Sequence, residues 1–321
     1  MKIARYEYRG SVMVGVVQED QVVPVAVGAG RAGQTALLDL AMTARSDPTL
    51  RPPATDEAVP LADVRLLPPV PSPPSIRDFY AFEQHVKTAR VRRGLDVHPD
   101  WYEIPVFYFS NPAAVIGPGD PVPVPPRSER LDFELEVAVV IGASGTVDSL
   151  GDAGPLVAGF CVLNDWSARD VQAREMAQSM GPVKGKDFAT SLGPVLVTTD
   201  EFAPGGLREV PSATMTARVN GREYSRSNLD TMWWSFAEML EYAAESTELR
   251  PGDVVGSGTC GTGCILELSL TSGEEAYPWL HPGDEVELEV EGLGVLANPV
   301  VGPRVPAWHP DPERVRPPQA T

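Results

Sequence analysis

The sequence predicts an α+β protein that is rich in strands, with a small β-rich domain at residues 1–70 and a larger one at 71–321. Short alternating or apolar runs, which are typical of strands, recur along the chain between turn residues. The 33 prolines and 29 glycines among 321 residues suit a loop-rich β fold and disfavour a helical bundle. A proline-rich segment at 68–74 is stiff and marks the expected domain boundary.

The expected elements follow from local periodicity. Residues 2–28 alternate as a hairpin or meander does, with a turn at Glu19-Asp20. Residues 34–44 have apolar side chains at helical spacing and predict a short helix, and 228–246 predict one long amphipathic helix. Type II turns, which need glycine at their third position, are expected at the Pro-Gly-Asp triplets 118–120, 251–253 and 282–284.

The stretch 131–142 reads LDFELEVAVVIG and predicts a buried strand that ends at its glycine. Glu134 and Glu136 are two positions apart in it, which places both side chains on one face of a strand. A solvent-facing acidic stripe is the ordinary interpretation of such a pair. The apolar neighbours favour burial instead, and two buried like charges need a cation between them. We therefore expect a hard-metal site here, with further ligands elsewhere in the chain.

Composition excludes several classes of partner. The net charge of −18 argues against nucleic acid and against an anionic membrane, but it leaves an anionic small-molecule substrate possible. No apolar run approaches the ~20 residues of a membrane span, and the first ten residues lack the apolar core of a signal peptide. Three cysteines give no disulfide framework, and we expect them to be small buried residues of a cytoplasmic protein.

Other segments contain candidate polar groups. We expect residues 76–94 to be helical from Asp78 onward, which would bring Asp78 and His85 onto nearly the same face. Asp165 follows an apolar run and suits either a ligand or a helix N-cap. Glu267 lies within the apolar run 265–270, which we expect to be a strand.

The glycines of residues 256–261 match a dinucleotide-binding fingerprint, G-x-G-x-x-G. That motif requires a helix after its glycines, whereas the following apolar run predicts a strand. The chain also lacks the Lys-Ser/Thr pair of a phosphate loop. Both nucleotide interpretations are therefore rejected.

Seven segments, taken together and in order, resemble the fumarylacetoacetate hydrolase family. They are RDFYAFEQH (77–85), IPVFYFSNP (104–112), DFELEVAVVIG (132–142), NDWSARDVQ (164–172), GKDF (185–188), SGT (257–259) and LELS (266–269). The resemblance covers about residues 75–294. It implies the mixed β-sandwich roll of that family and a homodimer. The apolar surface expected of Trp233, Trp234 and the long helix also favours a dimer.

The resemblance also implies a role for each matching residue. The implied metal ligands are Asp78, Glu134, Glu136 and Asp165. The implied water-activating pair is His85 and Glu267, and the implied oxyanion and carboxylate contacts are Lys186, Arg169 and Gln172. Further substrate contacts are Tyr80, Tyr108 and Thr259. Arg90, Arg92 and Arg93 compete for the position of one more substrate-binding arginine.

An all-oxygen ligand set favours Mg²⁺, Ca²⁺ or Mn²⁺ over zinc, and we expect Mg²⁺. The expected reaction is hydrolysis of a carbon–carbon bond in a β-diketo acid or acylpyruvate, by water activated by His85 and Glu267 and through a metal-stabilised enolate. The alternative on the same scaffold is a 2-oxo acid isomerase, hydratase or decarboxylase. A catalytically idle metal-binding module is the third hypothesis.

Overall fold

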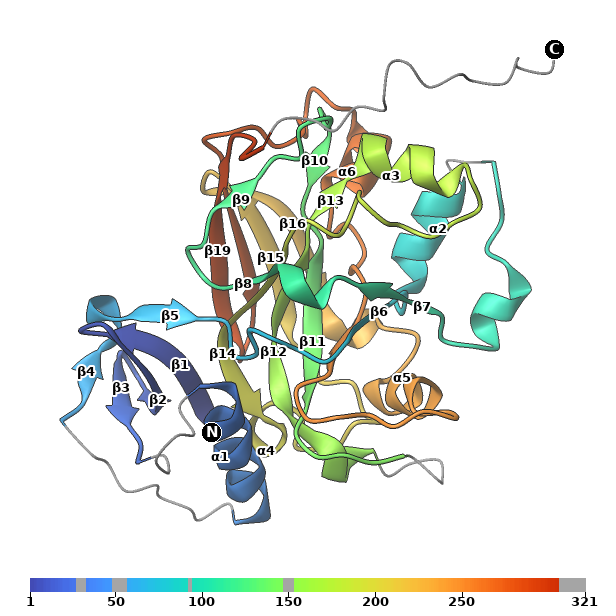
Figure 1. The fold of residues 1–321 in the computed structure, drawn as a ribbon. Coiled ribbons are helices and arrows are strands. Elements are labelled where there is room, and N and C mark those ends of the chain that lie inside the picture. The colour runs from blue at the N-terminus through green and yellow to red at the C-terminus, as the bar shows by residue number, and fades with distance from the viewer. Residues whose placement is uncertain (27–32, 48–56, 92–93, 147–152, 306–321) are drawn as a thin grey trace, which may run out of the picture.

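A computed structural model describes residues 1–26, 33–47, 57–91, 94–146 and 153–305 (Figure 1). Its largest element is an open mixed sheet with the strand order β4-β3-β2-β1-β14-β12-β11-β17-β6-β7, to which β5 and β8 add at β1 and β14. The strand-rich α+β class that the sequence predicts is confirmed. Within the described residues, no helix is long and apolar enough to span a membrane.

The N-terminal part forms one end of this sheet. Its elements are β1 (Lys2–Tyr8), β2 (Ser11–Gln18), β3 (Gln21–Pro24), α1 (Gln34–Ser46), β4 (Val59–Pro60) and β5 (Arg65–Leu67). The predicted meander and short helix are both present, and the turn residue Glu19 has a φ of 54°. Where β1 meets β14, Lys2 and Ile3 pair with Val197 and Leu196.

The centre of the sheet contains the strands on which the candidate site is built. They are β6 (Ile76–Phe79), β7 (Phe107–Ser110), β8 (Val115–Ile116), β11 (Leu135–Ile141), β12 (Val157–Asp165), β14 (Thr190–Thr198) and β17 (Val254–Gly256). Every residue of β11 is buried, as its apolar run predicts. The predicted strand is however divided, because β10 (Leu131–Asp132) leaves the sheet to pair with β13 (Ser167–Ala168). Glu134 therefore lies in the connection just before β11.

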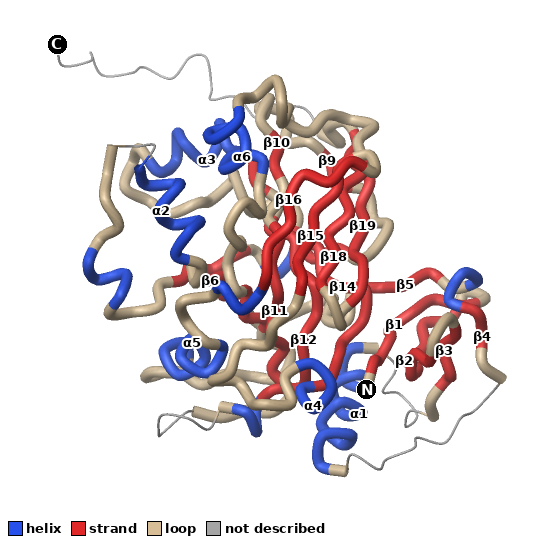
Figure 2. The backbone as a smooth tube through the Cα atoms, turned by 180° about the vertical axis from the view of Figure 1, so that it is seen from behind, coloured by secondary structure: helices blue, strands red, loops and turns tan. Residues whose placement is uncertain are grey.

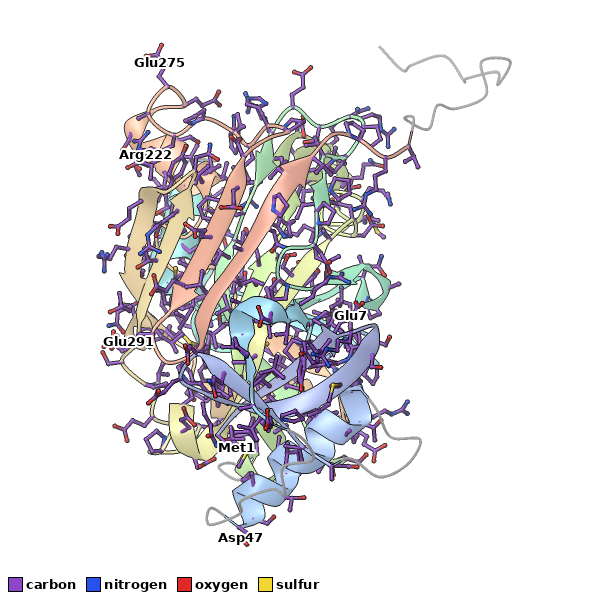
Figure 3. The ribbon with its side chains drawn as sticks, turned by 90° about the vertical axis from the view of Figure 1, so that its left-hand side faces the viewer. Met1, Glu7, Asp47, Arg222, Glu275 and Glu291 are labelled. Atoms are coloured by element: carbon purple, nitrogen blue, oxygen red, sulfur yellow. The ribbon has the colours of Figure 1, made fainter. Side chains whose placement is uncertain are left out.

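A second open sheet covers one face of the first (Figure 2). Its order is β16-β15-β18-β19-β9, formed by β9 (Val122–Pro123), β15 (Thr214–Val219), β16 (Arg222–Asn228), β18 (Glu285–Val290) and β19 (Gly294–Val301). Figure 3 shows Arg222 and Glu291 at opposite ends of this sheet, and Asp47 at the far end of α1. The larger apolar core includes side chains from both sheets.

Turns and cysteines follow the sequence predictions. Gly119, Gly252 and Gly283, the glycines of the three Pro-Gly-Asp triplets, have φ values of 74°, 91° and 104°. A positive φ is what a type II turn requires at that position, and only glycine adopts it without strain. All three cysteines are free and buried, and they are Cys161, Cys260 and Cys264.

Two helix predictions need correction. The remaining helices are α2 (Glu83–Val91), α3 (Arg169–Met176), α4 (Thr199–Phe202), α5 (Phe236–Ala243) and α6 (Ile265–Ser272). Asp78 is not helical, because residues 76–79 pair with β17 on one side and β7 on the other. The predicted long helix at 228–246 shrinks to α5, since β16 extends to Asn228 and a capping box of Ser235 and Glu238 begins the helix.

Residues 265–270 belong to the helix α6, so the predicted strand around Glu267 is wrong. The short apolar run fits a buried helix as well as a strand, and a distant side chain selects the helix. Asp132 accepts hydrogen bonds from the backbone N–H groups of Ile265 and Leu266, at 2.7 and 3.0 Å. Because a helix follows the glycines 256–261 after all, the reason given above for rejecting a dinucleotide fingerprint is also wrong.

Candidate metal centre and active site

Four buried carboxylates, which we call the carboxylate centre, meet in the middle of the large sheet. They are Asp78 on β6, Glu134 before β11, Glu136 on β11 and Asp165 at the end of β12. One oxygen from each lies within 4.8 Å of the others. The structure thus brings together all four residues that the sequence implies as metal ligands.

Three oxygens of the carboxylate centre are buried without a hydrogen-bond partner among the described residues. They are Asp78 Oδ1, Glu136 Oε2 and Asp165 Oδ1. A Cβ at Gly256 would lie 2.4 Å from Asp78 Oδ1 and 3.1 Å from Glu136 Oε2, so only glycine leaves this space open. Unsatisfied buried carboxylate oxygens are costly, and a hard divalent cation is the partner that such oxygens fit. The residues present therefore fit a divalent metal ion.

Two cations already contact one side of the centre. Lys186 Nζ lies 2.5 Å from Glu134 Oε2 and also hydrogen-bonds Asp165 Oδ2, while Arg169 Nη2 lies 2.7 Å from Glu134 Oε1. Both oxygens of Glu134 are thereby paired. Although burial alone would raise the pKa of Glu134, attraction to Lys186 and Arg169 lowers it. The buried carboxylates still outnumber these two cations, and a divalent ion would offset the excess negative charge.

The other three carboxylates favour their protonated forms. Burial raises the pKa of Glu136 and of Asp165 well above the ordinary value, and it also raises the pKa of Asp78. Repulsion from neighbouring carboxylates adds to this effect, and for Asp165 the attraction of Lys186 opposes only part of it. A proton and a metal ion therefore compete for the same oxygens.

His85 on α2 and Glu267 on α6 form a second buried group. His85 Nδ1 lies 3.0 Å from Glu267 Oε2, and the ring of Tyr80 packs edge-on against the imidazole with the ring centroids 5.5 Å apart. If Nδ1 donates to the carboxylate, Nε2 is left with its lone pair. No described residue hydrogen-bonds Nε2, which suits a base that faces a substrate.

Both groups border one cavity of 330 Å³. Its lining includes most of the residues that the sequence singles out, namely Asp78, Tyr80, His85, Tyr108, Glu134, Glu136, Arg169, Gln172, Lys186 and Thr259. Asp165 and Glu267 contact that lining from behind, through Lys186 and His85. Apolar side chains such as Phe79, Val106 and Leu266 complete the wall.

Two of the three implied substrate contacts also hydrogen-bond carboxylates of the centre. Tyr108 donates a hydrogen bond from its hydroxyl to Asp165 Oδ2, and Thr259 Oγ1 lies 3.3 Å from Glu136 Oε1. Burial and the charge of Asp165 raise the pKa of Tyr108 well above its ordinary value, so its hydroxyl stays a donor. Tyr108 and Thr259 therefore position carboxylates of the centre as well as lining the cavity.

Asp132 is a site residue that sequence reasoning missed. It is fully buried, and its Oδ2 accepts a hydrogen bond of 2.7 Å from Arg169 Nε, while its two oxygens also cap the start of α6. It connects the arginine of the carboxylate centre to the helix that carries Glu267. The available signal was its place in the Asp-Phe-Glu-Leu-Glu run, where a third buried acid needs its own partner.

Of the three arginines that compete for the substrate-binding position, the structure describes only Arg90. Arg90 lines the cavity, and its Nε also donates a 2.6 Å hydrogen bond to the backbone oxygen of Asp96. Arg92 and Arg93 lie outside the described residues.

Gln172 Oε1 accepts a hydrogen bond of 3.2 Å from Arg169 Nη1, which turns the amide nitrogen of Gln172 away from that arginine.

Comparison with known proteins adds two matches to family models. Residues 75–301 match the model described as fumarylacetoacetate hydrolase, C-terminal, and residues 1–69 match one described as Rv2993c-like, N-terminal. The first match includes every residue of the carboxylate centre as well as His85 and Glu267. The two matches adjoin at the proline-rich segment 68–74.

Individual relatives have different described activities. The chain is 36% identical over 201 residues to a mitochondrial oxaloacetate tautomerase, FAHD2A, of Bos taurus, spanning 61% of this chain and 59% of that protein. It is 29% identical over 309 residues to a fumarylacetoacetase of Oryza sativa, spanning 78% and 72% of the two chains. A solved fumarylacetoacetate hydrolase from Exiguobacterium antarcticum superposes with a TM-score of 0.71 at 26% identity, covering 94% and 99%.

Proposed function

Because this chain belongs to the fumarylacetoacetate hydrolase family, we propose that it is a metal-dependent enzyme that hydrolyses a carbon–carbon bond in a small β-diketo acid or acylpyruvate. The observation that carries the proposal is the single cavity bordered by both the carboxylate centre and His85. A substrate there can contact an electrophilic cation and a base at the same time.

We propose Mg²⁺ as the ion, held by Asp78, Glu134, Glu136 and Asp165. When bound, such an ion polarises the carbonyl oxygens of a 2-oxo or diketo acid as a Lewis acid. Arg169 is fixed in place by Asp132 and Glu134, and Lys186 by two carboxylates. These cations, with Gln172 and Arg90, surround the cavity with donors for an anionic substrate.

His85 takes the first proton in the proposed reaction. Its Nε2 removes a proton from water while Glu267, at 3.0 Å from Nδ1, stabilises the imidazolium that forms. The water oxygen adds to the distal carbonyl carbon, and the bond from that carbon to the central carbon breaks. The electron pair leaves as an enolate, which takes a proton back from His85. The products are a carboxylic acid and a 2-oxo acid.

Product analysis tests this reaction directly. Incubating the protein with acetylpyruvate and MgCl₂ should release acetate and pyruvate in equal amounts, and a chelator should abolish the release until Mg²⁺ is returned. Release that a chelator leaves unchanged would refute the role of the metal.

Tautomerisation of a 2-oxo acid is the second candidate, supported by the 36% identity to oxaloacetate tautomerases. In that reaction His85 would move a proton between carbon and oxygen, and no water would be consumed. Following the ultraviolet absorbance of enol-oxaloacetate with and without the protein measures it. Fast enol decay without acetate release from acetylpyruvate would replace hydrolysis by tautomerisation as the function.

We also propose that the protein is a homodimer and that it is located in the cytoplasm. Trp233 is 51% exposed and packs against Trp101 and Tyr102, which leaves an aromatic surface for a second copy. Light scattering at micromolar concentration should give twice the mass of one chain. Cell fractionation tests the location.

A further inference from the structure

A second cavity, of 450 Å³, lies beside β6 and is lined by Arg77, Phe107, Phe109, Tyr242 and Glu245, among others. Arg77 and Asp78 are successive residues of β6, and successive side chains of a strand point to opposite faces. In Figure 1, α2 lies above β7 and α5 below it. The first cavity is lined from α2, whereas the second is lined from the end of α5.

Arg77 has unused hydrogen-bonding capacity at this cavity. Its side chain is only 7% exposed, and Nη1 donates one hydrogen bond of 2.7 Å to Ser75 Oγ. Nε is buried without a hydrogen-bond partner in the part of the chain that the structure describes. A guanidinium has five N–H donors, and a buried donor without an acceptor costs free energy. Arg77 lines the cavity, so an acceptor bound there can approach its guanidinium group.

The nearest carboxylate forms a buried ion pair with this arginine but no hydrogen bond. Asp253 Oδ2 is 3.6 Å from Arg77 Nη1, beyond hydrogen-bond distance. The oxygens of Asp253 instead accept from the hydroxyl of Ser75, at 2.7 Å, and from the backbone N–H of Arg250, at 2.8 Å. The other acid at the cavity is Glu245, which is exposed, so water screens its repulsion of an anion.

Aromatic rings supply the rest of the wall. The Arg77 guanidinium lies 5.3 Å from the centroid of Phe109, whose side chain is 63% exposed. Phe107 packs edge-on against both Phe109 and Tyr242. We propose that this cavity binds a small carboxylate with an apolar body, its carboxylate on Arg77 and its body on Phe107, Phe109 and Tyr242.

Calorimetric titration of the full-length protein with benzoate tests the site. Benzoate should bind, inorganic phosphate should bind more weakly because it lacks the apolar body, and benzyl alcohol should give no heat because it lacks the charge. Arg77→Met should weaken benzoate binding about tenfold or more, since charge-assisted hydrogen bonds are the strong ones. Equal affinity for phosphate and benzoate would overturn the proposed ligand class.

Two further variants locate the binding. Phe109→Ala removes an exposed ring and should preserve the fold, which circular dichroism checks, while weakening benzoate binding several-fold. Arg90→Met, the matched arginine of the first cavity, should leave benzoate binding unchanged. Loss of binding in Arg90→Met with full binding in Phe109→Ala would place benzoate in the first cavity and overturn the proposal, as would the absence of benzoate binding to the unmodified protein.

Discussion

The carboxylate centre rests on the strands β6, β11 and β12, whereas the His85–Glu267 pair rests on the helices α2 and α6. In the first region like charges face each other, and three carboxylate oxygens have no partner among the described residues. In the second, a carboxylate and an imidazole satisfy each other at 3.0 Å. The first region is therefore incomplete without an ion, while the second is complete as a proton-transfer pair. Variants in the two regions should fail in different ways.

Asp165→Ala should give the largest loss. It removes one ligand and a partner of Lys186, so we expect both Mg²⁺ binding and turnover of the diketo acid to disappear. Calorimetric titration with Mg²⁺ and steady-state kinetics measure the two effects. Asp63→Ala, at an exposed carboxylate in the N-terminal part, is the control and should change neither. Mg²⁺ binding retained by Asp165→Ala would remove Asp165 from the ligand set.

His85→Ala should instead separate metal binding from catalysis. We expect kcat to fall roughly 10²–10⁴-fold, the usual contribution of one general base, while Mg²⁺ affinity stays unchanged. His98→Ala, at an exposed histidine, is the matched control. A single-turnover rate equal to that of the unmodified protein would exclude His85 as the base.

The two regions are alike in how far the sequence predicts them. The motifs identify all four carboxylates and both members of the His85–Glu267 pair, because residue type and order define them. The local structure around Asp78 and Glu267 is mispredicted because it depends on distant partners. Asp78 is in a strand only through pairing with β7 and β17, and Glu267 is in a helix whose first N–H groups are capped by Asp132, 133 residues away from Ile265. No local pattern contains that information, and the role of Asp132 was missed for the same reason.

Asp132→Asn should perturb both regions, but less than the changes above. An asparagine has the same shape as the aspartate that it replaces. Its amide nitrogen, however, would face either Arg169 or a backbone N–H group, and two hydrogen-bond donors repel each other. We expect the free energy of unfolding to fall by about 1–3 kcal/mol and kcat to fall less than in His85→Ala. Thermal unfolding and kinetics measure these effects. Asp63→Asn, at an exposed acid in the N-terminal part, is the control. Unchanged stability and turnover would contradict the connecting role of Asp132.

The smallest expected effect is a change in the pH dependence of stability. Burial raises the pKa of Asp78, Glu136 and Asp165 above the ordinary values of 3.8, 4.5 and 3.8. Without metal, the folded protein therefore holds protons that the unfolded chain has released, and its stability falls as pH rises above these values. Glu134 contributes in the opposite sense only below pH 4.5, because its pKa is lowered.

Mg²⁺ should reverse this trend, since it binds the deprotonated carboxylates. The difference in melting temperature between protein with Mg²⁺ and protein with chelator should therefore widen from about pH 5 to about pH 8. Surface groups titrate equally in both samples, so the difference isolates the centre. The variant Glu136→Gln lacks one titrating group. Its metal-free form should therefore lose less stability over this pH range than the metal-free unmodified protein. A temperature difference that stays constant with pH would show that protons and the metal ion do not compete at these carboxylates, and it would separate the carboxylate centre from any metal-dependent activity.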